Sequence, residues 1–461
     1  MSVAVALWID DADYIDDRSE EALEYLLSML DRLGIRATFK LAGEKIRTLE
    51  RHGRNDLIKA LCRHDLCYHS DFHSLHPTVT EYTESLSFHD GAAEFEKREM
   101  QGFRDLQRIT GREVVGFGQP GESWSPDVFP ILRKNQALVN LDDHFILDVD
   151  GMAFSYGGVL NFNHIRRIRR YDYHDEAGLK SAEDEFDRLA ETDFGRDYPE
   201  TVRLFSVFYH PSEFFSAEYL GDYYNFRGGK NLAYDDEGNF RGYIMPPGLD
   251  RDTEHEYMER VGRYLSHMLE YGAHFVTAND LTGMQIRRGR RIDLSDVREL
   301  ADSFSRGEIS FHDIGGEYVS PSEAFALISE ALSGKPLSTF LIYGPERREV
   351  SCIDASAVIT SEQAANAMKD FDMICGYPQL KSLYAFEKAR LAPADLCATA
   401  AYMLANDLDS CHPVHGTLKC EECVQYHSDW SNRWLFGDDF HVPNTYEKTK
   451  LQCWTLKPVR Y

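Results

Sequence analysis

The chain opens with an apolar run over residues 3–9, which predicts a buried strand. Two adjacent acids, Asp10 and Asp11, end this run. Alanine and leucine then recur at helical spacing over residues 19–33, and Gly34 follows, which favours a helix with a serine cap and a glycine end. The chain therefore begins with a strand–helix unit that carries two carboxylates at the carboxyl end of its strand.

The same unit recurs along the first part of the chain. Further strands are predicted at residues 37–41, 65–68, 114–117, 138–141, 203–209 and 272–277. Helices are predicted between them at residues 55–63, 91–110, 176–189 and 253–271, and directly after Pro126. Seven or so such units predict an α/β fold, a distorted (β/α)7-type barrel with fewer units than the eight of a closed TIM barrel. Such barrels carry their chemistry at the carboxyl ends of the strands.

The arginine-rich stretch 287–291 marks a change in this pattern. We place a barrel domain before it, residues 1–288, and a smaller, mainly α-helical accessory domain after it, residues 289–461. Residues 319–328 and 391–400 are alike: a proline stands near each helix start, an acid follows two residues later, and apolar residues recur at helical spacing. The second domain is therefore expected to contain a duplicated helical unit.

Two histidines four residues apart, His69 and His73, follow the predicted strand at 65–68. If the backbone there turns like a helix, both rings can point at one spot. A carboxylate from the end of another strand would then complete a His-His-Asp set of the kind that binds a divalent metal. The alternative is a pair of surface or capping histidines, and His76 offers a second, partly similar spacing.

Taken in order, several segments resemble the polysaccharide deacetylase domain, also called the NodB-homology domain, of carbohydrate esterase family 4. These segments are Trp8-Ile9-Asp10-Asp11, residues 34–39, His69-Ser70-Asp71-Phe72-His73, and the strand at 203–209 with His210 and Pro211 after it. The resemblance covers residues 1–285. It implies the NodB-like form of the distorted barrel.

The resemblance also implies a role for each matching residue. Asp11, His69 and His73 would bind a divalent metal, with zinc expected first and cobalt, nickel, iron or manganese as alternatives. Asp10 would act as general base on the metal's water, and His210 would protonate the departing amine. The implied reaction is hydrolysis of a carbon–nitrogen bond that is not a peptide bond, with N-deacetylation of an amino sugar as the expected case.

The chain departs from the family at the third motif. Where the family has Arg-x-Pro-x-Gly, residues 118–122 read Gly-Gln-Pro-Gly-Glu, so the arginine that would hold the catalytic aspartate is missing. Gln119, Pro120 and Gly121 are expected to face the substrate, and Gln119 is a candidate to orient the aspartate instead. Asp143 is expected at the same pocket, as the acid that tunes the catalytic histidine; a structural role in a turn is the alternative.

Two other functions stay open. The barrel could be an amidohydrolase of another substrate, such as a formyl or cyclic amide. It could instead be a catalytically weak protein that binds carbohydrate, for which the missing arginine is the main argument. In each case the expected partner is a carbohydrate or a small amide.

The composition limits which binding partners and which cellular compartment are expected for the protein. A formal net charge of −27 argues against nucleic acid or an anionic membrane as a partner. The chain shows no basic leader and no apolar stretch of membrane-spanning length, and its nine cysteines fit a reducing cytoplasm. Cys411, Cys420, Cys423 and His427 have the ligand types of a structural zinc site, with reduced core cysteines as the alternative.

Overall fold

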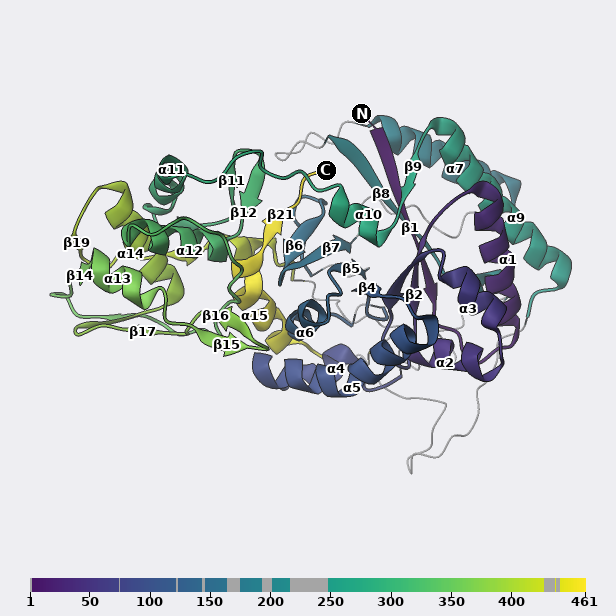
Figure 1. Cartoon of the computed structure of the whole chain (residues 1–461), viewed down its shortest axis with the longest axis horizontal. Helices are drawn as coiled ribbons and strands as arrows, with labels where there is room; N and C mark the ends of the chain where they lie inside the picture. Colours follow the sequence, from purple (N-terminus) through teal and green to yellow (C-terminus); the bar gives the residue numbers. More distant parts are fainter. Residues whose placement is uncertain are drawn as a thin grey trace, which may run out of the picture.

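The computed structural model of the chain shows a barrel-like part beside a second, largely helical region (Figure 1). It describes residues 2–73, 75–121, 123–142, 146–163, 175–192, 201–215, 248–426, 436 and 440–461. In this part of the chain, no helix is both long enough and apolar enough to cross a membrane.

One curled sheet of ten strands forms the barrel-like part, in the order β21-β6-β7-β5-β4-β3-β2-β1-β8, with β9 also paired to β1. The strands are β1 (Ser2–Asp11), β2 (Thr38–Leu41), β3 (Asp65–Tyr68), β4 (Val114–Phe117), β5 (Val139–Asp142), β6 (Phe154–Tyr156), β7 (Val159–Asn163), β8 (Val202–Tyr209), β9 (His274–Val276) and β21 (Lys457–Pro458). All pairs are parallel except those of β6 with β7 and with β21. This curled, mainly parallel half-barrel confirms the predicted distorted (β/α) barrel.

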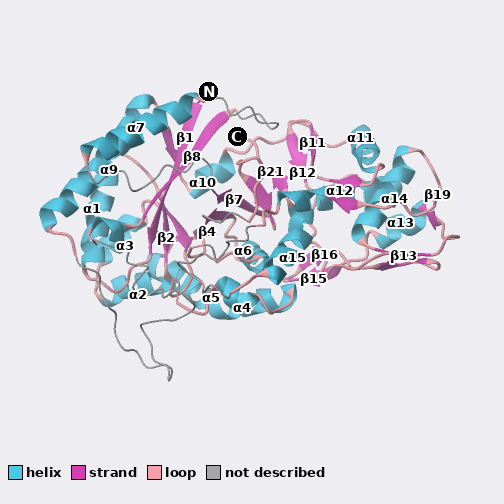
Figure 2. Ribbon diagram, turned by 180° about the vertical axis from the view of Figure 1, so that it is seen from behind, coloured by secondary structure: helices cyan, strands magenta, loops and turns pink. Residues whose placement is uncertain are grey.

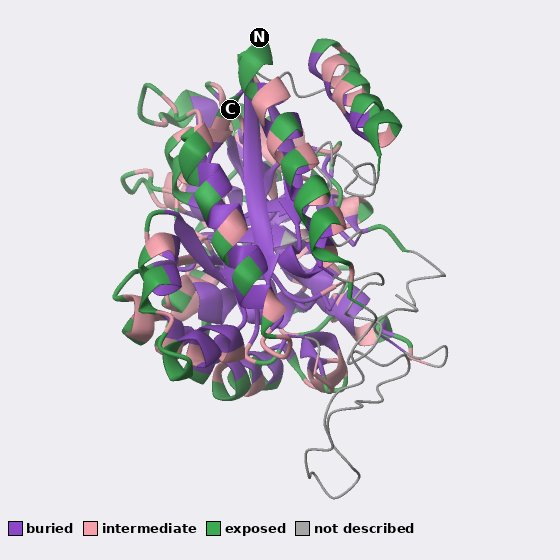
Figure 3. Cartoon of the chain, turned by 90° about the vertical axis from the view of Figure 1, so that its right-hand side faces the viewer, coloured by how far each residue is buried: buried purple, intermediate pink, exposed green. Residues whose placement is uncertain are grey.

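Strand β1 lies between β2 and β8 in the strand order and is buried on both faces, as a parallel strand covered by helices must be (Figure 3). Its odd-numbered side chains Val3, Val5, Leu7 and Ile9 pack into the core between sheet and helices. Its even-numbered side chains Ala4, Ala6 and Trp8 pack into a second core on the inner side of the curl. Because successive strand residues point to opposite faces, Asp10 continues the inner row and Asp11 the outer one.

Helices cover the outer face of the sheet (Figures 1 and 2). They are α1 (Arg18–Leu33), α2 (Gly43–Arg51), α3 (Asn55–Leu61), α4 (Val79–Thr83), α5 (Phe88–Thr110), α6 (Phe129–Lys134), α7 (Glu176–Glu191) and α9 (Arg251–Tyr271). The short helix α10 (Ala278–Gly283) instead packs Ala278 and Leu281 into the core on the inner side of the curl. Gly34 ends α1 in the left-handed conformation, with φ of 68°, as the sequence predicts. The predicted serine cap is not used: Asp17 precedes the helix, and the Ser19 hydroxyl donates to the Asp13 carbonyl.

The second region is helical with short strand pairs around the helices. Its helices are α11 (Leu294–Phe304), α12 (Pro321–Leu332), α13 (Ser361–Ala367) and α14 (Pro393–Ala405). Its strands are β10 (Glu308–Ile309), β11 (His312–Ile314), β12 (Glu317–Val319), β13 (Cys352–Ile353), β14 (Ile359–Thr360), β15 (Asp372–Ile374), β16 (Tyr377–Gln379), β17 (Tyr384–Ala385), β18 (Ala389–Leu391), β19 (Ser410–Cys411) and β20 (Thr417–Leu418). Helices α12 and α14 both begin with proline in the first turn, at the two segments predicted to be duplicated.

The end of the chain returns to the first sheet. Helix α15 (Pro443–Gln452) leads through a short turn to β21, which pairs with β6 of the barrel. Along α15, the buried Lys448 ammonium lies 2.7 Å from an oxygen of the buried Asp127. The boundary predicted near residue 288 stays a prediction, but the last residues of the chain belong structurally to the barrel sheet.

Candidate active site at the carboxyl ends of the barrel strands

A buried ion pair between Asp10 and Lys40 stands at the centre of the site. The two residues are direct partners on the parallel strands β1 and β2, so their side chains leave the sheet on the same face. Lys40 Nζ lies 2.9 Å from Asp10 Oδ1 and donates to the Leu141 carbonyl at 3.0 Å. Burial alone would raise the pKa of Asp10, but Lys40, and then His69 and His210, hold it below its ordinary value. Asp10 is therefore a stable anion at neutral pH.

His69 presents a free ring nitrogen to this anion. Its Nδ1 lies 2.5 Å from the Gly118 carbonyl oxygen, which only accepts, so Nδ1 carries the proton. The other nitrogen, Nε2, lies 3.8 Å from Asp10 Oδ2 and has no hydrogen-bond partner among the described residues. Burial lowers the pKa of His69 to about 4, although Asp10 opposes the change. The ring is therefore neutral at pH 7, with a lone pair on Nε2.

Two further histidines approach the same space. His210 follows β8, and its Nε2 lies 3.7 Å from Asp10 Oδ2, while its Nδ1 lies 3.2 Å from Glu213 Oε1. The ring of His73 lies 4.9 Å from that of His69, between centroids. Burial, followed by His69 and His210, holds the pKa of His73 well below its ordinary value.

The loop that carries His69 and His73 is not the helix-like turn that their spacing suggested. Ser70 and His73 are both left-handed, with φ of 59° and 58°, and the Ser70 hydroxyl donates to the His73 carbonyl at 2.8 Å. His76, the second candidate, is turned away from the centre, because its Nδ1 lies 2.7 Å from the Glu81 carboxylate that caps α4. The structure thus brings His69 and His73 together by a strained loop and leaves His76 outside.

Asp11 lies on the other side of the sheet. Its Oδ1 is 3.3 Å from Lys45 Nζ, and Lys45 also donates to the Asp13 carbonyl and the Ser19 hydroxyl. Burial raises the pKa of Asp11, and Lys45 opposes this change. The predicted metal ligand therefore does not meet the two histidines, because adjacent residues of a strand point to opposite faces.

The described residues do not form a metal site in this arrangement. Among them, no three histidine, cysteine, aspartate or glutamate side chains are grouped so that they could hold an ion. Lys45 supplies a cation to Asp11, the expected metal ligand, and Lys40 supplies one to Asp10, the expected general base. The ligand set Asp11, His69 and His73 stays a prediction that this geometry does not assemble.

Among the described residues, the cysteines of the predicted second metal site belong to no group of three ligands that could hold an ion. Cys411 Sγ is 3.9 Å from the Thr399 carbonyl, and Cys420 Sγ is 3.6 Å from the Ser310 hydroxyl. Burial raises the pKa of all three thiols, to about 11 for Cys411 and Cys423 and about 12 for Cys420. His427 lies outside the described residues. The three thiols are therefore protonated, as reduced core cysteines are.

The residues expected to face the substrate follow β4. Gln119 is buried directly beside Gly118, Pro120 accepts from the Ser123 amide at 3.3 Å, and Gly121 is left-handed with φ of 53°. Asp143 lies outside the described residues. Lys40, not Gln119, pairs with Asp10, and sequence reasoning missed it. Its signal was present, since a lysine inside a short apolar strand needs a buried anion.

Glu99 on α5 holds the loop of the two histidines in place. It accepts from the Asp71 amide at 2.8 Å and from the Tyr68 hydroxyl at 3.0 Å. Burial is the main cause that raises its pKa from 4.5 to about 7. The folded protein therefore binds this proton more tightly than the unfolded chain, and stability falls as the pH rises through this window.

The replacement Glu99→Gln is expected to remove this loss of stability with rising pH. The variant should keep both hydrogen bonds as acceptor, and above pH 7 it should be more stable than the wild type by roughly 2–3 kcal/mol. Urea unfolding at pH 5 and pH 8 measures the difference. Glu96→Gln, at a carboxylate of the same helix whose side chain is 40% exposed, is the control and should keep the wild-type pH slope. Equal pH slopes in wild type and Glu99→Gln would contradict the assignment.

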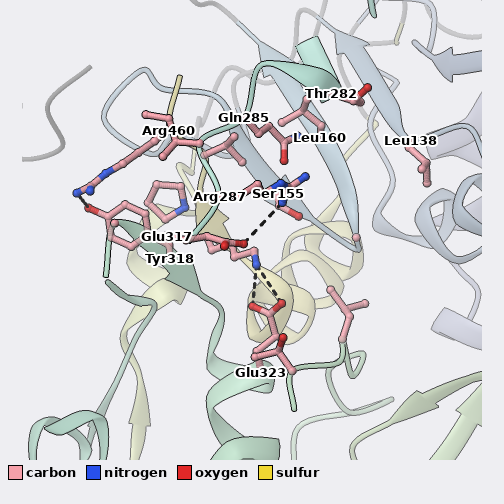
Figure 4. Close-up of a pocket in the computed structure, with 18 of the residues that line it drawn as sticks. Leu138, Ser155, Leu160, Thr282, Gln285, Arg287, Glu317, Tyr318, Glu323 and Arg460 are labelled. Carbon is pink, nitrogen blue, oxygen red and sulfur yellow. Dashed lines mark hydrogen bonds and ion pairs between the residues drawn. The ribbon is translucent and has the colours of Figure 1, made fainter. Parts of the chain in front are cut away.

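A separate pocket of about 480 Å³ lies between the β6–β7–β21 edge and the second region (Figure 4). None of the Asp10 cluster lines it. Its basic side chains have partners: Lys457 contacts both Glu323 oxygens at 2.9 Å, and Arg460 donates to the Tyr318 hydroxyl at 2.9 Å. These paired charges fasten the end of the chain to the second region.

No protein-family model and no curated protein matches this chain. Solved structures that it matches include a family 4 acetyl xylan esterase from Clostridium thermocellum with a cobalt ion, at 14% identity and a TM-score of 0.33 over 61% of this chain and 91% of that one. Another is a peptidoglycan N-acetylglucosamine deacetylase, at 12% identity and a TM-score of 0.32 over 60% and 86%. A third is a family 4 pseudoenzyme from Bacillus anthracis, at 15% identity and 0.32 over 61% and 65%.

These structures thus include both deacetylases and a pseudoenzyme. At such identities and TM-scores the likeness does not bear on the chemistry of this chain. In structure, the chain is similar to carbohydrate esterase family 4 proteins over about three-fifths of its length.

Proposed function

We propose that this protein hydrolyses a carbon–nitrogen bond, other than a peptide bond, in an acylated amino sugar or a related carbohydrate. One observation carries the proposal. Strands β1, β3 and β8 bring His69 Nε2 and His210 Nε2 to within 3.8 Å and 3.7 Å of the same oxygen of Asp10. Two imidazoles that share one anion at the carboxyl end of a barrel are suited to move protons in opposite directions.

The neutral His69 is the better base of the group. Asp10, paired with Lys40, holds its proton too weakly to be an effective base, so the role foreseen for Asp10 passes to His69. Water attacks the amide carbonyl carbon as His69 Nε2 takes one of its protons. Asp10 then stabilises the imidazolium that forms, and the Gly118 carbonyl holds the ring in the required tautomer.

His210 completes the reaction. As the carbon–nitrogen bond breaks, His210 Nε2 gives a proton to the departing amine, while Glu213 holds its Nδ1. A divalent ion such as zinc, if bound, would polarise the carbonyl and acidify the water. The described residues do not group to hold one, and the proton transfers above need only side chains of this chain.

Carbohydrate binding without turnover is the second candidate. The observation that favours it is the Asp10–Lys40 pair itself, because Lys40 occupies the carboxylate that lies within 3.8 Å of both His69 and His210. A protein of this kind would still bind the carbohydrate but would not hydrolyse it at a useful rate.

Release of primary amine from a panel of substrates tests the proposal. The panel contains N-acetyl and N-formyl glucosamine oligosaccharides and small cyclic amides, each incubated with the full-length chain. The proposal expects amine from at least one of them at a rate proportional to protein concentration. Calorimetric binding of an oligosaccharide with no amine released would instead establish the second candidate.

A further inference from the structure

We infer that Lys40 is the positioning residue of this site: a fixed cation that holds Asp10 between His69 and His210 and takes the place of a divalent ion. This role deepens the proposed function and rests on it where activity is measured. Lys40 comes from β2, in a segment that matches none of the residues to which the sequence assigned chemistry.

Three contacts fix the ammonium of Lys40. It lies 2.9 Å from Asp10 Oδ1, donates to the Leu141 carbonyl of β5 at 3.0 Å, and lies 4.8 Å from the centre of the Trp8 ring. The side chain is only 4% exposed, so water does not compete for these contacts. Because Lys40 occupies Oδ1, it leaves Oδ2 of Asp10 facing the two histidines.

Gly118 makes room for this lysine. A Cβ atom at Gly118 would lie 2.2 Å from the Leu141 carbonyl oxygen that binds Lys40, 2.7 Å from Lys40 Cδ and 2.9 Å from Lys40 Nζ, so a side chain here would displace the lysine from its position. Gly118 stands two residues before Pro120, where the resembling motif carries its arginine. The chain thus lacks a cation at this position and places one from β2 in the same space. The Gly118 carbonyl also accepts from Nδ1 of His69, so the same glycine lies beside both Lys40 and the proposed base.

A divalent ion at Asp10 would have to share a dry site with this ammonium. The two cations would repel each other strongly, because little water screens them there. Asp11 offers no alternative, since it lies on the opposite face against Lys45. The arrangement therefore favours a centre whose cation is the Lys40 ammonium over a centre that binds a divalent ion.

The variants Lys40→Met and Lys40→Arg test this role, with Lys45→Met as the matched control. Cobalt binding is measured first, by equilibrium dialysis and visible absorption, because it needs no substrate. The wild type should bind cobalt weakly, and Lys40→Met should bind it at least about 10-fold more tightly through Asp10 and the histidines. Lys40→Arg, which keeps the charge, and Lys45→Met should bind it as weakly as the wild type.

Activity on a hydrolysed substrate gives the second readout. Lys40→Met should lower kcat about 10²-fold with little change in KM, because Lys40 acts through Asp10 and does not touch the substrate. Lys40→Arg should regain part of this loss, and Lys45→Met should keep the wild-type kcat per folded molecule. If Lys40→Met does not fold, Asp10→Asn combined with Lys40→Met removes both charges and should melt at a higher temperature than either single variant.

A wild type that binds one equivalent of cobalt tightly overturns the inference, as does an unchanged cobalt affinity in Lys40→Met. Equal kcat values in wild type and Lys40→Met overturn it as well. If the wild type hydrolyses nothing, the proposed function fails, whereas the cobalt and melting experiments still decide the role of Lys40.

Discussion

Deletion of residues 443–461 is expected to unfold the barrel, although none of these residues belongs to the Asp10 centre. The deleted segment supplies β21, which pairs with β6 at one end of the sheet. It also supplies Val459 and Tyr461 to the inner core that holds Trp8. Loss of this segment exposes apolar surface on the inner side of the sheet, which a domain of ordinary stability cannot sustain.

Hydrogen bonds from the buried α15 make the loss larger. Trp124 Nε1 donates to Thr449 Oγ1 at 3.1 Å, and the Tyr156 hydroxyl donates to the Thr449 carbonyl at 2.9 Å. Without α15, Asp127 is left as a buried carboxylate without its lysine. A broken buried ion pair alone costs roughly 3–5 kcal/mol, a large part of the roughly 5–15 kcal/mol that stabilises a folded domain.

Circular dichroism and thermal melting of the shortened chain measure the effect. We expect no cooperative transition, and the same result for a chain cut near residue 290. A pair of single variants provides the control: Lys448→Met should lower the free energy of unfolding by roughly 3–5 kcal/mol, whereas Lys450→Met on the same helix should change it by less than about 0.5 kcal/mol. A folded, cooperative fragment would show instead that the barrel is independent of the chain end.

His210→Ala is expected to lower amide hydrolysis by roughly 10²–10⁴-fold, because the departing amine loses its proton donor. The fold should not change, since His210 follows the end of β8 and its two ring nitrogens face Asp10 and Glu213 rather than the core. KM should change little if the loss is confined to the transition state. Steady-state kinetics with the best substrate of the panel measures both constants.

A substrate with a good leaving group separates this role from a general loss of structure. An activated amide, whose leaving group needs no proton, should be hydrolysed by His210→Ala at close to the wild-type rate. His76→Ala, which alters a histidine turned away from the centre, is the matched control and should keep full activity. An equal loss on both substrates would remove the acid role from His210.

The hydrophobic pattern predicted most of the barrel because its strands are parallel and buried on both faces. The run that ends at Asp10 and the helix that ends at Gly34 both lie where the pattern placed them. The last strand, β21, could not be predicted in this way. It has two residues, and its place depends on a partner three hundred residues earlier in the chain.

The sequence predicted which histidines lie at the site, but it did not predict the ion pair between Asp10 and Lys40. His69 and His210 follow predicted strands, and the structure brings both to one carboxylate. The alternation of side chains along a strand could have shown that Asp10, and not Asp11, lies on the same face as Trp8. Lys40 could be recognised as a buried cation from β2, but its partner depends on strand register and on the space beside Gly118, which only the folded chain defines.

Amine release by metal-free wild-type protein tests the central claim most directly. The protein is stripped with a chelator, its metal content is measured, and hydrolysis of the best acylated amino sugar is followed before and after stripping. If His69, Asp10 and His210 work around the fixed Lys40 cation, the stripped protein should hydrolyse the substrate at an unchanged rate. Activity that disappears on stripping and returns with one equivalent of zinc or cobalt would contradict this account.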